Sequence, residues 1–251
     1  MKHSVLLSVL VLMGLSALPA AAATLVASDT PPDFLTTEPR VSSQFRNGQA
    51  GLAGAGEIYV APSANAGNTP TRAEGQFAWS NNTLYTFTFS YDSDGGFGGQ
   101  GLLTSTLRET AQAPGAAQSA VFGDTAGEVV SSDLTFNAMR FNVQGNSNGD
   151  ETLSVNEMFI NGMQIDTAPF GTPGAFADFG VTGFGTVSDF DIVGQLTRPG
   201  SSLGTSQAAP RLDFVLGTVE DLSEIPLPAS AWMLLAALAG LGAGLRRRRA
   251  A

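Results

Sequence analysis

The chain has 251 residues and no cysteine, and its only lysine and only histidine are Lys2 and His3. The rest of the chain therefore lacks the side chains for Ser-His-Asp or Cys-His catalysis, Schiff-base chemistry, imidazole or thiolate metal sites, and disulfides. All 22 acidic residues lie between Thr24 and Glu224 with seven arginines, a net charge of −15. This charge excludes a nucleic-acid partner, because such binding needs a basic surface, and it leaves carboxylate chemistry and oxygen-ligand cation binding.

The N-terminus has the pattern of a secretory signal peptide. Lys2 precedes an apolar stretch, Val5–Leu18, that is too short to span a membrane stably, and Ala20–Ala23 supplies an Ala-x-Ala cleavage site. We expect residues 1–23 to be removed after export by the Sec machinery, so that residues 24–224 form the exported domain.

Alternating side chains in the exported domain predict β-strands. Tyr85–Tyr91 alternates aromatic with small polar residues, which places four rings on one face of a strand. Gln76–Trp79 and the turn Ser80–Thr83 are expected to complete a hairpin with it. A second hairpin is predicted over Phe159–Ile165, since Asn161-Gly162 suits a type I′ turn.

Further strands are predicted with less regular patterns. One of them, Leu134–Val143, changes phase and should contain a bulge near Asn137-Ala138. Leu102–Ala111 is the one stretch with some helical periodicity. The other candidate strands are Ile58–Val60, Phe190–Leu196 and Leu212–Leu216. Together with loops rich in Gly, Ser, Asn and Pro, the pattern predicts an all-β fold, an antiparallel two-layer sandwich of jelly-roll type.

The two predicted hairpins, Trp79–Tyr91 and the Asn-Gly hairpin, resemble the exported domains found on bacterial proteins with interchangeable C-terminal anchors, the choice-of-anchor domains. The resemblance implies a β-sandwich and brings no catalytic residues with it.

Two turns rich in Asp and Asn are candidate calcium sites. The first has oxygen side chains at alternate positions and an acidic residue at the EF-hand distance: Asn146, Asn148, Asp150 and Glu157. It departs from that pattern in opening with Asn and in having Glu151 where the loop needs Gly. The second candidate is Asp92 with Asp94, at a strand end. Polar turn formation also explains both segments, and we expect it over calcium binding.

A glycosidase is the enzyme class that the composition leaves open, because two carboxylates suffice for it. The candidates are Glu57, Glu74, Asp92 and Glu128. Nothing pairs them in the sequence, and we expect no enzymatic activity. The aromatic side chains that would stack on a sugar if exposed are Tyr85, Phe87, Phe89 and Tyr91. Alternating rings on one strand more often form core, and we expect that here.

The C-terminus carries a short apolar segment between a proline-containing motif and a basic cluster. The motif is Ile225, Pro226, Leu227, Pro228 and Ala229. The 17 residues of 229–245 contain no charge, near the lower limit for a transmembrane helix. The cluster that ends the segment is Arg246, Arg247, Arg248 and Arg249. Because arginines stay on the cytoplasmic side, we expect the C-terminus inside and the preceding domain outside the inner membrane.

This tail, 225–251, resembles the bacterial PEP-CTERM sorting signal in its Val-Pro-Leu-Pro-Ala form, with Ile225 in place of Val. The resemblance implies processing by an exosortase-like membrane enzyme and delivery to the cell surface or extracellular matrix. The two prolines hold the motif extended, as a protease substrate requires. We expect a structural or adhesive protein of extracellular polymer or biofilm. A plain stop-transfer anchor and a surface carbohydrate-binding module or glycosidase are the alternatives.

Overall fold

The computed structural model describes residues 24–28, 31–34, 38–47, 55–113, 117–144, 153–166, 176–198 and 210–219. These residues form thirteen β-strands and no helix, which confirms the all-β prediction. The strands are β1 (Thr24–Val26), β2 (Val41–Asn47), β3 (Ala55–Ala61), β4 (Ala73–Ala78), β5 (Thr83–Asp92), β6 (Leu102–Glu109), β7 (Gln118–Phe122), β8 (Phe136–Gln144), β9 (Ser154–Ile160), β10 (Met163–Asp166), β11 (Phe176–Val187), β12 (Phe190–Arg198) and β13 (Arg211–Gly217).

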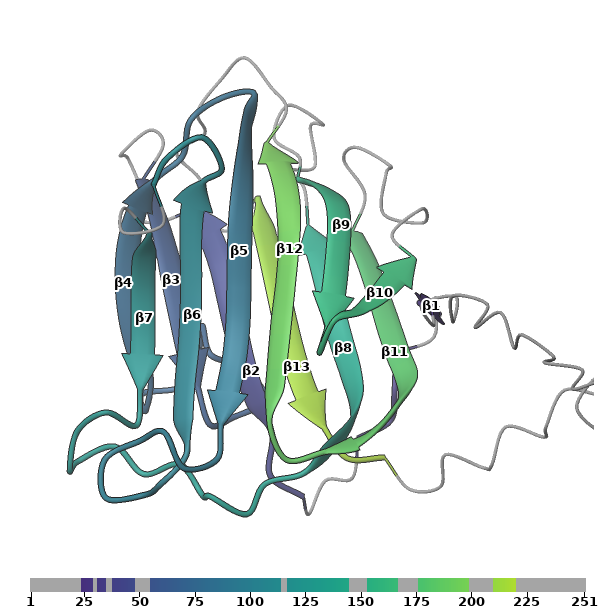
Figure 1. Cartoon of the computed structure of the whole chain (residues 1–251). Helices are drawn as coiled ribbons and strands as arrows, with labels where there is room; N and C mark the ends of the chain where they lie inside the picture. The colour runs from purple at the N-terminus through teal and green to yellow at the C-terminus, as the bar shows by residue number, and fades with distance from the viewer. Residues whose placement is uncertain are drawn as a thin grey trace, which may run out of the picture.

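The strands form two sheets that face each other (Figure 1). One sheet has seven strands in the order β1-β10-β9-β12-β5-β6-β7, and the other has six in the order β11-β8-β13-β2-β3-β4. Neighbouring strands run antiparallel, except that β1 and β10 pair in parallel. The predicted two-layer β-sandwich is therefore present, with one mixed and one antiparallel sheet.

The core between the sheets combines aliphatic side chains with many aromatic ones. Tyr85, Phe87, Phe89 and Tyr91 of β5 all point into it, and none is more than 2% exposed. The Phe87 ring meets Phe214 of the opposite sheet with ring centroids 5.5 Å apart. Burying such a ring contributes about 1.5–3 kcal/mol, so alternation along β5 decides which face turns inward. The core interpretation of these four residues is confirmed, and they offer no platform for a sugar.

The predicted Asn-Gly hairpin is confirmed. β9 and β10 pair in antiparallel register, with Ile160 opposite Met163. The φ angles of Asn161 and Gly162 between them are 49° and 76°, the positive values that a type I′ turn requires.

The predicted hairpin over Gln76–Tyr91 is wrong. β4 pairs with β3 in the six-stranded sheet, whereas β5 pairs with β6 and β12 in the seven-stranded sheet. Trp79 lies between the two strands in sequence and is only 2% exposed, with its ring edge-on to Phe77 and Tyr85. Burial of Trp79 in the core thus accompanies a crossing from one sheet to the other.

The remaining strand predictions are confirmed as β3, β8, β12 and β13, and Leu102–Ala111 contains strand β6 instead of a helix. A register shift does occur beside the predicted bulge at Asn137-Ala138. It lies between Thr182 and Val187, so the surplus residues belong to β11, the partner of β8.

Candidate functional site

A row of polar side chains crosses the outer face of the six-stranded sheet. Strand register aligns one polar residue from each strand in turn: Asp178, Asn142, Asp213, Gln44, Tyr59 and Glu74. Since side chains alternate along a strand, apolar neighbours such as Phe141 and Phe214 point inward. An outward polar row is ordinary on a solvated sheet. Here its centre is buried, because Gln44 and Asn142 are only 5% and 7% exposed.

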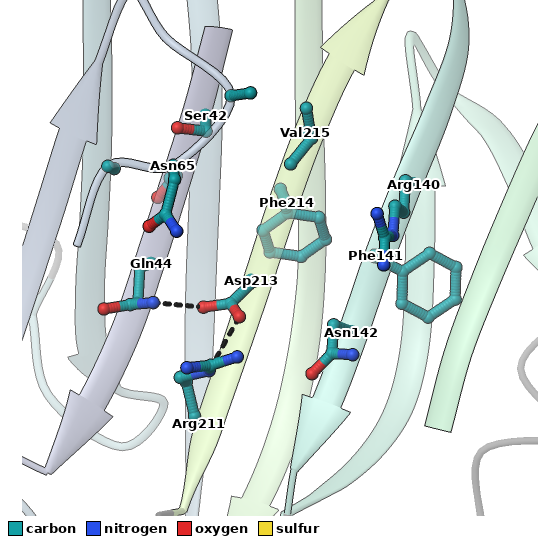
Figure 2. A pocket seen from close by; sticks show the side chains of 13 residues that line it. Ser42, Gln44, Asn65, Arg140, Phe141, Asn142, Arg211, Asp213, Phe214 and Val215 are labelled. Carbon is teal, nitrogen blue, oxygen red and sulfur yellow. Dashed lines mark hydrogen bonds and ion pairs between the residues drawn. The ribbon is translucent and has the colours of Figure 1, made fainter. Parts of the chain in front are cut away.

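A pocket of about 170 Å³ lies over this buried centre (Figure 2). β2, β13 and β8 form its floor, and loop residues 64–66 lie at its side. We call it the outer-sheet pocket, and its principal polar side chains are Ser42, Gln44, Arg140, Asn142, Arg211 and Asp213.

Two ion pairs balance the charge in and beside the outer-sheet pocket. Arg211 Nε lies 2.7 Å from Asp213 Oδ2. Arg140 Nε donates a hydrogen bond to Asp178 Oδ1 at 2.8 Å. Because each guanidinium has its own carboxylate, the two ion pairs contribute no net charge when both acids are ionised.

Three buried oxygen atoms of the outer-sheet pocket have no hydrogen-bond partner among the described residues: Ser42 Oγ, Gln44 Oε1 and Asn142 Oδ1. Leaving a buried polar group unpaired costs about 1–3 kcal/mol. Gln44 Oε1 lies against the loop, since a Cβ added to Gly67 would be 2.2 Å from it. In Figure 2, the Gln44 amide nitrogen points to Asp213 and the oxygen points away. Of the other two oxygens, Asn142 Oδ1 belongs to the polar row and lies on the strand next to Asp213, whereas Ser42 is two residues before Gln44 on β2.

Burial raises the pKa of Asp213 to about 6, against lowering contributions from Arg211, Gln44 and Arg46. A carboxyl with this pKa changes charge between pH 5 and 7, whereas an ordinary aspartate is ionised throughout that range. The outer-sheet pocket is therefore neutral above pH 7 and gains positive charge as the pH falls.

Arg72 fastens the loop beside the outer-sheet pocket, residues 62–72, to Tyr59 of the sheet. The Tyr59 ring has the guanidinium of Arg46 4.7 Å from its centroid and that of Arg72 4.5 Å away. Arg72 also donates hydrogen bonds to the carbonyls of Gly67 and Thr69, at 3.0 and 3.1 Å. Ala66 of the loop adds an apolar contact, because it is buried in a small hydrophobic cluster with Tyr59 and Ala61.

The structure does not gather the four proposed catalytic carboxylates into one site. Glu57 and Glu74 lie on the outer face of neighbouring strands, and each is bound by an arginine, Arg46 and Arg72 respectively. Asp92 ends β5 in the other sheet. Glu128 accepts a hydrogen bond from the Gly123 backbone at 2.9 Å. Glu57 and Glu74 serve as ion-pair partners in this arrangement.

The calcium candidates are only partly within the described residues. Three lie outside them: Asn146, Asn148 and Asp150. Glu157 is on β9, while Asp92 and Asp94 lie at the end of β5. The pKa of Asp94 is raised by a hydrogen bond with Asp92 and by the charge of Asp92. Across the described part of the chain, no three His, Cys, Asp or Glu side chains gather in a way that could hold a metal ion.

No model of a known protein family matches the chain, and a comparison with curated proteins likewise finds no match. Among the residues that the structure describes, no helix has the length and apolarity to cross a bilayer. The expected signal peptide and the tail 225–251 lie outside those residues.

Sequence reasoning did not find the outer-sheet pocket. Two of its segments fall in or beside predicted strands and read as ordinary half-exposed strand: Arg140-Phe141-Asn142 and Arg211-Leu212-Asp213. The third, Ser42-Ser43-Gln44, was not predicted as a strand. The one available signal was that Asn142, a residue type uncommon in strands, occupies an outward position of one of these segments. That signal identifies neither the strand neighbours nor the covering loop.

Proposed function

We propose that this chain is an exported protein of the cell surface or extracellular matrix, with a structural or adhesive role and no catalytic one. Residues 1–23 direct export, and the tail 225–251 is processed by an exosortase-like enzyme from a transient transmembrane helix, 229–245. The exported part is a β-sandwich, for which we retain the jelly-roll topology as part of the proposal.

The observation that carries the export proposal is the ordered combination of motif, apolar segment and arginine cluster in the tail. Each part of the tail serves one step of processing at the membrane. The two prolines hold the motif extended for the enzyme, the apolar segment enters the bilayer, and the arginine cluster stops its transfer. A permanent anchor would gain from more Leu, Ile and Phe than the Ala- and Gly-rich segment 229–245 contains.

Adhesion is favoured over a purely structural role by the outer-sheet pocket, because unpaired buried oxygens on an outer face suit ligand binding. Binding is favoured over hydrolysis because a glycosidase needs two carboxylates facing one bond. Among the residues that line the pocket, Asp213 is the single carboxylate, and it is already held by Arg211 and Gln44. A surface carbohydrate-binding module is therefore the second candidate function.

Intact-mass measurement of the protein from its own cells tests the export proposal. We expect a chain that begins at Thr24 and has lost 229–245 with the arginine cluster. A variant combining Pro226→Ala and Pro228→Ala should keep the tail, because its motif no longer holds an extended backbone. Recovery of unaltered protein ending at Ala251 would contradict sorting and leave a plain anchor.

A further inference from the structure

We infer that the outer-sheet pocket binds one ring of a neutral, polyhydroxylated ligand, as found in the sugar residues of extracellular polymers. Asn142, Asp213 and Arg211 form the polar contacts. The inference rests on the proposed function in one respect: an exported protein would meet such polymers outside the cell. The preference for a neutral, hydroxyl-bearing ligand is argued from the residues that line the pocket.

The size of the outer-sheet pocket limits the ligand. Its volume of about 170 Å³ is below the roughly 300–1,000 Å³ of pockets that enclose drug-sized ligands. It is also several times the roughly 30 Å³ that one water occupies in the liquid. One small ring therefore fits, while the rest of a polymer would remain outside on the sheet surface.

The charge balance of the pocket selects a neutral ligand. Anion sites rely on guanidinium groups that can form bidentate bonds with the ligand, but Arg140 and Arg211 are each paired with an aspartate. A cation is disfavoured as well, because Arg211 lies 2.7 Å from the one carboxylate that lines the pocket. Neither an anionic nor a cationic ligand would gain enough electrostatic attraction in this pocket to offset the cost of removing its charge from water.

The polar groups of the pocket suit hydroxyls. Asn142 Oδ1 is a buried acceptor that no described residue satisfies, and it needs an O–H or N–H donor. Asp213 lies directly opposite Asn142 on the adjacent strand. Arg211 adds N–H donors to the same side, so hydroxyls on neighbouring ring carbons can donate to Asn142 and Asp213 and accept from Arg211 (Figure 2). Because a hydroxyl both donates and accepts, one ring with adjacent hydroxyls satisfies this mixed set.

Saturation-transfer NMR on the full chain tests the inference. The protein is kept in a polyoxyethylene detergent, since sugar-based detergents would compete. Probes are glucose, galactose, mannose and N-acetylglucosamine. Glucuronate is observed directly as a charged comparator, whereas sulfate and Ca²⁺ carry no protons and are added as competitors of the bound sugar. We expect at least one neutral sugar to bind with a Kd on the order of 1 mM, and every charged comparator to bind at least tenfold more weakly.

Three variants localise the binding. Asn142→Leu removes the unpaired acceptor and should raise the Kd at least tenfold. Val215→Phe fills the pocket while keeping its polar groups and should do the same. Asn156→Leu makes the same change on the outer face of the seven-stranded sheet and should leave the Kd within twofold. Far-UV circular dichroism shows that each variant is folded before its Kd is compared.

Three results would overturn the inference: no neutral sugar binding up to about 50 mM, tighter binding of a charged comparator, or binding that survives both pocket variants. The first would mean that the outer-sheet pocket holds only water. None of these results bears on the intact mass of the exported protein, so the export proposal stands or falls separately.

Discussion

The Asp213 carboxylate on β13 accepts a hydrogen bond of 2.7 Å from the side-chain amide of Gln44 on β2, although 169 residues separate the two in sequence. The bond joins two strands at the centre of the polar row, and Arg211 holds the other carboxylate oxygen. Two distant segments of the chain thus meet at the carboxyl group whose pKa burial raises to about 6.

The stability of the fold should depend on pH through Asp213. Burial raises its pKa from the ordinary 3.8 to about 6, so the folded chain binds this proton more tightly than the unfolded chain. Its contribution is fully present below about pH 4 and is lost as the pH rises through 6, a loss of about 3 kcal/mol. Urea denaturation from pH 4 to 8 should show that Asp213→Asn lacks this loss. Parallel profiles for the two proteins would contradict the assignment.

Replacing either of two buried asparagines of β8 by leucine should change the stability of the fold in opposite directions. The Asn137 side chain donates to the Val219 carbonyl at 3.2 Å and accepts from its N–H at 2.9 Å, whereas Asn142 Oδ1 is unpaired among the described residues. Asn137→Leu should lower the free energy of unfolding by about 1–3 kcal/mol, because it leaves two backbone groups unsatisfied. Asn142→Leu should be neutral or stabilising by up to about 1 kcal/mol, since it removes a buried polar group that has no partner. Equal losses in urea denaturation would refute the contrast.

Gly194 of β12 should not tolerate a methyl group. A Cβ there would lie 2.4 Å from Phe87 Cζ and 2.6 Å from the Glu157 carbonyl oxygen. Since the Phe87 ring is fully buried, Gly194→Ala should lower stability by about 1–3 kcal/mol. Gly127→Ala is the matched control, because a Cβ at that position meets no atom within 4 Å. Thermal denaturation of both variants decides, and a Gly194→Ala melting temperature equal to that of Gly127→Ala would count against tight packing.

Arg72 should govern the mobility of loop 62–72. Arg72→Met removes its contact with the Tyr59 ring and its hydrogen bonds to Gly67 and Thr69. Losing about 1–2 kcal/mol of local stability should speed hydrogen exchange at loop amides by roughly 5- to 30-fold. Arg108→Met, which removes hydrogen bonds to backbone carbonyls elsewhere, should leave these rates unchanged. Unaltered loop exchange in Arg72→Met would show that other contacts hold the loop.

Local pattern was sufficient for much of the fold. The alternation of Tyr85–Tyr91 is a property of neighbouring residues, and it correctly predicted which side chains fill the core. The Asn161-Gly162 turn was equally local, because its positive φ angles depend on two residues alone. The absence of cysteine, and of lysine and histidine beyond Lys2 and His3, excludes whole classes of chemistry by composition alone.

Strand pairing and the outer-sheet pocket were decided by tertiary structure. A turn-like segment at Ser80–Thr83 reverses the chain equally well within one sheet or between two, and burial of Trp79 accompanies the second outcome. The pocket needs the register of β2, β8 and β13, which brings Gln44, Asn142 and Asp213 into one row. Register between distant strands depends on how all their inward side chains pack together, so no single segment contains it.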